Sequence, residues 1–209
     1  MPVHRVSAGN LRADALDPEH RFASMPLHVR NPSGAKGMIR RQCTREYKLD
    51  VIRRKVRELH LVAERRPVEQ WMGISLDETP RMRTSDVRYI TNVYPLVDER
   101  MTRWDCQRWL AEHGWKSVPK SSCIGCPFHS DRQWRELRDH SPEEWADAVA
   151  FDREIRAGHR GAINKAELQG QAFLHASLVP LDQADLSTPE DHGQLNLFES
   201  DCQSGVCGL

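Results

Sequence analysis

The feature that most constrains this chain is a pair of cysteines separated by two residues, with two further cysteines far upstream. Cys123 and Cys126 lie in the segment Ser-Cys-Ile-Gly-Cys-Pro at residues 122–127, where glycine and proline favour a tight turn. Two thiolates on one turn can bind one metal centre, and two more brought in by the fold would complete a four-sulfur shell. The sequence therefore predicts a metal site formed by Cys43, Cys106, Cys123 and Cys126.

Each part of this set also has a simpler interpretation. Cys106 shares one face of a predicted helix with Trp109 and Leu110, so it could be a small apolar residue of the core. The Cys-x2-Cys pair could be a redox-active dithiol if it opened a βαβ unit. We favour a metal because the other cysteines are present, and His129 is an alternative ligand for a mixed site.

The composition indicates one modest cytoplasmic domain with a tail. Of 209 residues, 39% are hydrophobic and 29% are charged, whereas an average globular domain is roughly 45–50% apolar. Part of the chain is therefore expected either to be exposed or to await a partner. No apolar run approaches the ~18 residues of a membrane helix, and the N-terminus has no signal-peptide region, so we expect no membrane partner. Cysteines inside the cell are more typical of reduced thiols or metal ligands than of disulfides.

Strand and helix signals alternate along the chain and predict an α/β fold. Short strands are expected at residues 3–6, 71–76 and 87–96, and residues 17–37 are expected to form a loop. Apolar residues at helical spacing predict a basic amphipathic helix from Cys43. Further helices are expected after the capping residues Thr102, Ser130 and Ser141, with Gly114 ending the first of these three.

Basic residues gather around the first cysteine and after the predicted strand at residues 71–76. Arginine side chains bind phosphate or sulfate oxygens through two parallel hydrogen bonds. We expect an anion site where two such loops meet at the ends of strands. Its predicted residues are Arg40, Arg41, Arg45, Lys48, Asp77, Glu78 and Arg81. A solvated helix face is the alternative, and we prefer it for Arg53, Arg54 and Arg57.

Four segments occur here in the same order as in phosphoadenosine phosphosulfate reductase-like proteins of the adenine-nucleotide alpha-hydrolase, or PP-loop, superfamily. They are Arg-Gln-Cys-Thr-Arg-Glu-Tyr-Lys at residues 41–48, Trp-Met-Gly-Ile-Ser-Leu-Asp-Glu at residues 71–78, Tyr-Pro-Leu at residues 94–96 and Ser-Cys-Ile-Gly-Cys at residues 122–126. The resemblance covers roughly residues 3 to 130. In the iron-sulfur reductases of this family, a Cys-Cys pair at the first position and a Cys-x2-Cys at the last hold the cluster. Here Thr44 follows Cys43, so Cys106 would supply the fourth thiolate.

The chain departs from that family in lacking its phosphate-binding loop. Ser7-Ala8-Gly9-Asn10 is only superficially similar to the Ser-Gly-Gly-x-Asp-Ser loop whose amides hold nucleotide phosphates. The resemblance then implies a partial PP-loop (HUP-like) sheet with flanking helices at residues 1–130. A helical extension at residues 131–158 and a polar C-terminal tail at residues 159–209 are expected to follow.

The resemblance also implies a function. It predicts an iron-sulfur protein with a 4Fe-4S cluster, and zinc is the alternative metal. The protein is expected to bind an adenine nucleotide or another sulfated or phosphorylated anion. The expected reaction is sulfur transfer or sulfonucleotide reduction. We expect the chain to be inactive alone and to need a PP-loop subunit or a homo-oligomer. The alternatives are a zinc-stabilised nucleic-acid-binding module, disfavoured by thirty basic and thirty acidic residues that cancel, and a non-catalytic structural subunit. Cys202 and Cys207, near the C-terminus, are given no role.

Overall fold

A computed structural model of the chain has a mixed α/β fold made of two compact units. It describes residues 2–17, 19–20, 25–115, 118, 122–156, 170–188 and 191–193. Unit 1 comprises Met1–Val51 and Ser122–Leu209, and unit 2 comprises Ile52–Ser121, so the chain leaves unit 1 within a helix and returns to it just before the Cys-x2-Cys pair. In the described residues, no helix has the length and apolar character needed to span a membrane.

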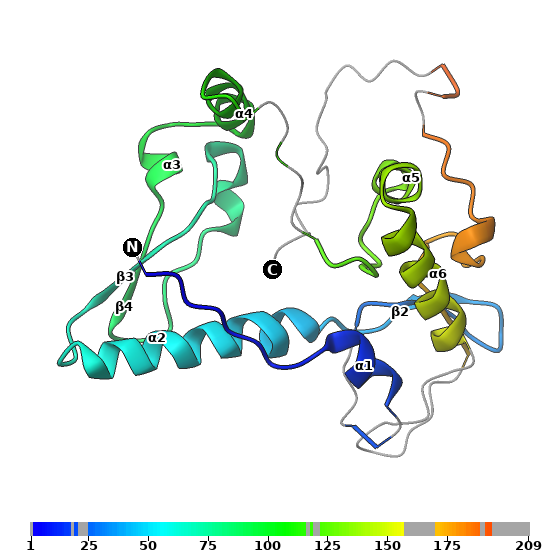
Figure 1. The fold of residues 1–209 in the computed structure, drawn as a ribbon, viewed down its shortest axis with the longest axis horizontal. Helices are drawn as coiled ribbons and strands as arrows, with labels where there is room; N and C mark the ends of the chain where they lie inside the picture. The colour runs from blue at the N-terminus through cyan, green and yellow to red at the C-terminus, as the bar shows by residue number, and fades with distance from the viewer. Residues whose placement is uncertain are drawn as a thin grey trace. The chain divides into compact units, whose positions relative to one another are not determined.

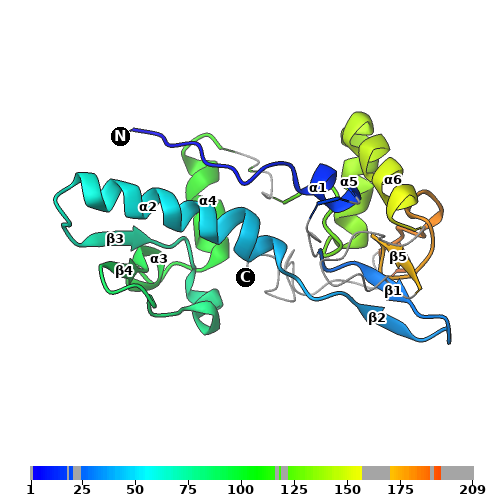
Figure 2. The same cartoon turned by 90° about the horizontal axis from the view of Figure 1, so that it is seen from below.

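Unit 1 contains a three-stranded antiparallel sheet in the order β2-β1-β5 (Figure 2). Its strands are β1 (His28–Arg30), β2 (Lys36–Met38) and β5 (Gln171–Phe173). His28 lies opposite Met38 on one side and opposite Phe173 on the other. Gly170 leads into β5 with a φ of 116°, and a Cβ atom there would collide with the carbonyl of Arg30. Glycine is therefore required where the two backbones approach.

Helices cover this sheet and supply most of the core. Those of unit 1 are α1 (Leu11–Leu16), α5 (Asp131–His140) and α6 (Pro142–Arg156), with the π-helical turn η1 (Arg45–Leu49) and the 3-10 turn η3 (Leu181–Gln183). The α6 helix packs against both α5 and β5 (Figures 1 and 2). Trp134 of α5 and Phe151 of α6 are buried together with Leu174 and Leu181, which follow β5.

One buried carboxylate joins α6 to the segment after β5. Asp152 is 1% exposed and accepts hydrogen bonds from the backbone N–H groups of Leu174, at 2.9 Å, and Leu181, at 3.0 Å. It also forms an ion pair with Arg156, one turn later on the same helix. These bonds satisfy a charge that would be costly to bury without partners.

Unit 2 contains a parallel pair of strands, β3 (Val68–Trp71) and β4 (Ile90–Val93), with Val68 opposite Ile90. Most of α2 (Asp50–Val62) belongs to this unit, which also has the 3-10 helix η2 (Leu76–Arg81), α3 (Pro95–Asp98) and α4 (Arg103–Glu112). The His60 ring of α2 stacks on Tyr89 at 3.9 Å between centroids, just before β4. This contact ties the helix to the strand pair.

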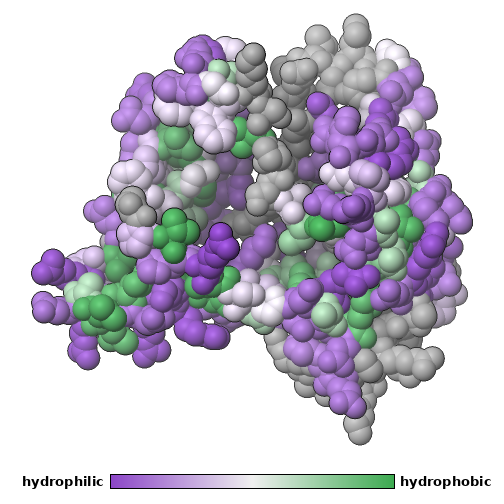
Figure 3. Space-filling model, in the orientation of Figure 1, coloured by the Kyte–Doolittle hydropathy of each residue, from purple (hydrophilic) through white to green (hydrophobic). Residues whose placement is uncertain are grey.

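Unit 2 leaves several large apolar side chains in solvent. Trp71 is 71% exposed, Trp104 is 63% exposed and Trp109 is 50% exposed. The space-filling view shows hydrophobic residues scattered among hydrophilic ones on this face of the molecule (Figure 3). No residue of α4 is buried, and its position depends on local contacts. Thr102 and Asp105 form a reciprocal capping box at its start, and the Asp77 carboxylate accepts a 2.7 Å bond from the Arg103 N–H.

The structure confirms most of the helices that the sequence predicts. Capping boxes at Thr102 and Ser130 open α4 and α5, and Gly114 ends the first with a φ of 89°. The basic helix from Cys43 is also present, although its first part is the π-helical turn η1 before α2 begins at Asp50.

The strand predictions require corrections. Residues 2–10 form no strand, and Val3 is exposed, because no neighbouring strand pairs with this segment in the described residues. The strand expected at residues 71–76 lies earlier, at Val68–Trp71. The expected loop at residues 17–37 contains β1 and the start of β2, because Pro32 and Gly34 form the turn of a hairpin rather than interrupting an element.

The largest correction concerns the end of the chain. Residues 170–188 fall within the stretch expected to be a polar tail, yet they supply β5, η3 and buried residues of the main core. Their short apolar segments have no helical period, so only tertiary contacts reveal that they are buried.

We predict that Asp152→Ala destabilises unit 1 by about 3–5 kcal/mol, since it leaves Arg156 and two backbone N–H groups without their buried acceptor. Hydrogen exchange at the Leu174 and Leu181 amides, combined with thermal unfolding, is the measurement. Asp147→Ala is the matched control, because Asp147 lies on the same helix but is largely exposed, 3.4 Å from Arg12. Equal effects of the two substitutions would contradict the assigned role.

Candidate metal centre

The Cys-x2-Cys segment forms two successive turns in unit 1. The Cys126 N–H donates to the Cys123 carbonyl at 3.1 Å, and the His129 N–H donates to the Cys126 carbonyl at 3.1 Å. Pro127 is buried between them, and its carbonyl accepts a 3.2 Å bond from His28 Nε2 on β1. We call residues 122–129 the cysteine loop, and these bonds fix it against the sheet.

Gly125 allows the cysteine loop to lie close to α6. A Cβ atom at this position would be 3.1 Å from Cδ1 of Phe151 and 3.8 Å from Cδ1 of Leu174. Phe151 is buried in the core and has little room to move. Packing thus favours glycine between the two cysteines, apart from any function of the thiols.

Cys43 approaches the cysteine loop from the segment before η1. Burial raises the pKa of the Cys43 thiol, and the nearby Cys123 raises it further, while a backbone bond at Thr44 and the charges of Arg41 and Lys48 act in the opposite direction. The interaction with Cys123 places these two thiols, 80 positions apart in sequence, in one electrostatic environment. Within unit 1, Cys43 and Cys123 are thus close enough to interact electrostatically, and Cys126 lies in the same loop as Cys123.

Cys106 belongs to unit 2. It lies on α4, where burial raises the pKa of its thiol and the carboxylates of Asp105 and Asp77 raise it further. Its convergence with the other three cysteines stays a prediction.

The donors fit a soft metal in chemistry, because thiolates favour zinc and iron-sulfur clusters. All four cysteines are free thiols. Within the described residues, no three His, Cys, Asp or Glu side chains are close enough together to form a ready-made metal site. Since the thiolate is the ligand, metal binding would have to release the proton of Cys43.

One of the predicted anion-binding residues contacts the cysteine loop directly. The guanidinium of Arg41 lies 5.5 Å from the centroid of the Phe128 ring, a cation–π distance. Arg40, Arg45 and Lys48 flank Cys43 in the same segment and are exposed. A positive surface therefore borders the thiols within unit 1.

The other predicted anion-binding residues belong to unit 2, where they have structural partners. Glu78 pairs with Arg81 and accepts a 3.2 Å bond from the Ser75 hydroxyl. Asp77 accepts the bond from Arg103 at the start of α4. Asp77, Glu78 and Arg81 therefore have structural roles that do not require a ligand. Their role in substrate binding stays a prediction.

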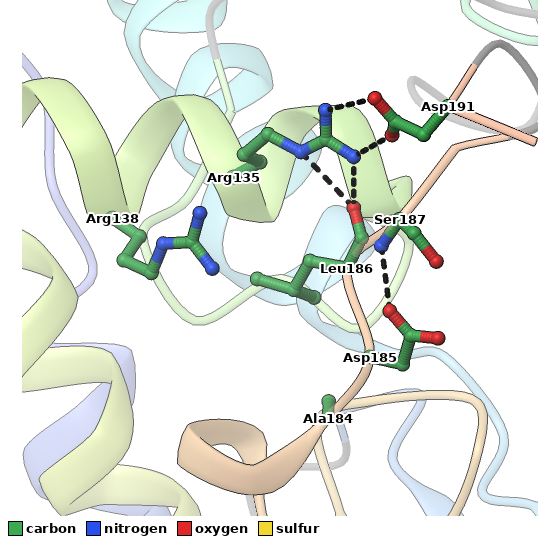
Figure 4. Close-up of a pocket in the computed structure, with 7 residues that line it drawn as sticks. All are labelled: Arg135, Arg138, Ala184, Asp185, Leu186, Ser187 and Asp191. Carbon is green, nitrogen blue, oxygen red and sulfur yellow. Dashed lines mark hydrogen bonds and ion pairs between the residues drawn. The ribbon is translucent and has the colours of Figure 1, made fainter.

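The sequence reasoning missed an open pocket of about 390 Å³ beside α5. Figure 4 shows Arg135 directed at the Leu186 carbonyl and the Asp191 carboxylate, with Arg138 one turn further along the helix. The bond to Arg135 holds the pKa of Asp191 far below its usual value, and backbone and hydroxyl bonds from Thr188 act in the same direction. Arg138 in turn pairs with Asp139 at 2.8 Å. Arg135 therefore holds the segment after β5, whereas Arg138 pairs within α5.

His28 and His175 were also missed. Burial lowers the pKa of His28 and the nearby His175 lowers it further, against the bond to Pro127, which raises it. Neither histidine lies in a recognisable motif, so the sequence had no signal for them. The two C-terminal cysteines, Cys202 and Cys207, lie outside the described residues.

Comparison with protein-family models, with curated proteins and with solved structures finds no match to this chain. The assignment of the site depends on its geometry and chemistry.

We predict that iodoacetamide modifies Cys123 before Cys43 in the metal-free chain at neutral pH. The thiolate is the reactive form, Cys123 is exposed, and burial both shields Cys43 and raises its pKa. Mass spectrometry of peptides from timed, quenched reactions measures both rates. The Cys43 rate should rise as the pH approaches its raised pKa.

The two rates should converge in denaturant, which serves as the control. The raised pKa of Cys43 also makes the stability of the fold depend on pH. The protonated thiol stabilises the folded chain at pH values below the unfolded-state pKa, and this contribution is lost as the pH rises through the folded-state pKa. Equal reactivity of the two thiols in the native chain would contradict the half-buried position of Cys43.

Proposed function

We propose that this chain is part of a phosphoadenosine phosphosulfate reductase-like protein and binds an adenylylated or sulfated anion beside a 4Fe-4S cluster. Cys43, Cys123 and Cys126 would hold the cluster, with Cys106 as the fourth ligand. When bound, the cluster would supply redox or Lewis-acid chemistry for sulfur transfer or sulfonucleotide reduction. A partner, either a PP-loop subunit or another copy of the chain, would supply the phosphate-binding loop.

The observation that carries this proposal is the meeting of two segments distant in sequence at the cysteine loop. Cys43 and Cys123 share one electrostatic environment, and Arg41, two residues before Cys43, lies against Phe128. An anion held by Arg41 would thus lie next to the thiols. A solvated basic helix face would not place its arginine on the ring of the segment that bears the cysteines.

The strand pair of unit 2 supports the need for a partner. Parallel sheets normally have both faces covered, and two strands alone are marginally stable. In the described part of unit 2, β3 and β4 pair only with each other, and Trp71 at the end of β3 is mostly exposed. Further strands and helices from a partner would complete this sheet. A nucleotide-binding half of the PP-loop type has the parallel strands to do so.

We predict that anaerobic reconstitution with iron and sulfide gives a brown protein with visible iron-sulfur absorption, while zinc gives none. Cys123→Ser should abolish the absorption and most of the bound iron, because it removes an exposed thiol that the proposal makes a ligand of the cluster. Iron, sulfide and zinc analyses complete the measurement.

Two further variants sharpen this experiment. Cys202→Ser combined with Cys207→Ser is the control, and it should leave the absorption unchanged if the cluster lies at the cysteine loop. Cys106→Ser tests the fourth ligand. A colourless protein that retains one tightly bound zinc would overturn the iron-sulfur proposal in favour of a zinc-stabilised module.

For the anion site we predict that Arg41→Ala weakens the binding of an adenylylated sulfate by roughly 1.5–3 kcal/mol, the range of a charge-assisted contact. Titration calorimetry measures the loss, with inorganic sulfate as the simpler probe. Arg54→Ala is the matched control, since Arg54 is an exposed arginine on α2. Unchanged affinity in Arg41→Ala would indicate that the basic segment is a solvated surface and not an anion site.

A further inference from the structure

A tightly held turn follows β5, at residues 175–178 of unit 1. The Leu178 N–H donates to the His175 carbonyl at 3.1 Å, and the Leu178 carbonyl accepts a bond from the Arg30 guanidinium. Leu178 is buried and has a φ of 61°, a conformation that is strained for a residue other than glycine. Such strain persists only where the surroundings impose it, and it is concentrated at functional sites.

The turn places a serine hydroxyl against a buried imidazole. His175 is 6% exposed, whereas Ser177 is exposed to solvent. The Nδ1 atom of His175 lies 2.7 Å from the Ser177 hydroxyl, and Nε2 lies 2.8 Å from a carboxylate oxygen of Asp131, the first residue of α5. Two residues of the turn and one residue of α5, 44 positions earlier in the sequence, thus form a continuous hydrogen-bonded series.

The chemistry of the three groups determines the direction of these bonds. An ionised carboxylate can only accept, so in the neutral ring the proton lies on Nε2 and faces Asp131. Nδ1 then carries a lone pair directed at Ser177, whose hydroxyl donates to it. The Ser177 backbone N–H also points at this nitrogen, at 3.2 Å, which agrees with an acceptor there.

We propose that Ser177 is the nucleophile of an acyl-transfer site, with His175 as its general base and Asp131 as the residue that positions the ring. The arrangement has the three parts that identify an activated nucleophile: a hydroxyl and a base in hydrogen-bond contact, and a third group that orients the base. We assign the substrate to the carboxylic esters. Because the Ser177 hydroxyl is exposed, such an ester can reach it from the surface. This activity is independent of the cysteine loop and of any bound cluster.

In the proposed step, the Ser177 oxygen forms a bond to the ester carbonyl carbon as its proton passes to Nδ1 of His175. The carbon–oxygen bond to the leaving alcohol then breaks, and the alcohol takes that proton. A water molecule hydrolyses the acyl-serine by the same route, with His175 accepting and returning a proton. The products are a carboxylic acid and an alcohol, and no cofactor is consumed.

The chain contains a natural comparison for this arrangement. Ser187 also contacts a histidine, with its hydroxyl 3.0 Å from Nε2 of His192. Within the described residues, no carboxylate is hydrogen-bonded to the His192 ring. Ser187 therefore has a base but no orienting group, and it should be much less reactive than Ser177.

The test uses a fluorophosphonate probe on the full-length chain, whose cooperative thermal unfolding is verified in the same buffer. Attack forms a serine oxygen–phosphorus bond and expels fluoride, and peptide mass spectrometry identifies the modified serine. We expect modification at Ser177 and not at Ser187. Asp131→Asn and His175→Gln should slow modification, the latter by roughly a hundredfold or more. Hydrolysis of p-nitrophenyl acetate should fall in parallel and disappear in Ser177→Ala.

Two results would overturn the proposal. One is a folded wild-type chain that the probe does not modify, or that it modifies equally at Ser177 and Ser187. The other is ester hydrolysis that persists in Ser177→Ala. Either would show that Asp131, His175 and Ser177 only stabilise the turn. Because Ser177→Ala removes one exposed oxygen, its unfolding temperature should match that of the wild type, which separates loss of reactivity from loss of fold.

Discussion

The buried carboxylate of Asp152 is the constraint on which the rest of unit 1 depends. It is 1% exposed and binds two backbone N–H groups that lie seven residues apart, at Leu174 and Leu181. A charge in such a position is tolerable only while all its partners are present. The segment after β5 is therefore held to α6, and Leu174 and Leu181 are directed into the core beside Trp134.

Both candidate sites of unit 1 lie against this assembly. Phe151, the residue before Asp152, packs on Gly125 between the two cysteines, and Leu174 contacts the same glycine position. Leu174 also precedes His175, which joins the turn bearing Ser177 to Asp131 on α5. The cysteine loop and the serine turn are thus supported by the same core, although their proposed chemistries are separate.

Unit 2 presents a different physical situation. Its parallel strand pair, the uncovered α4 helix and the exposed tryptophans bury little apolar surface for a segment of this length. Local contacts hold it instead, such as the stacking of His60 on Tyr89 and the capping bonds at Thr102. A partner that covers these surfaces would contribute the hydrophobic stabilisation that the chain does not supply here, which accords with the proposed PP-loop subunit.

The sequence alone determined those features that depend on neighbouring residues. Capping boxes at Thr102 and Ser130, glycine after α4 and the tight turn at Cys123 and Cys126 are local, and each was predicted correctly. Tertiary structure decided the remainder, because it joins segments with no common pattern. It brought Cys43 and Cys123 into one electrostatic environment, buried Leu174 and Leu181 of a segment predicted to be a tail, and brought Asp131 to His175. Such long-range pairings depend on packing and on hydrogen bonds to buried polar groups. A short stretch of sequence contains no pattern that predicts either of them.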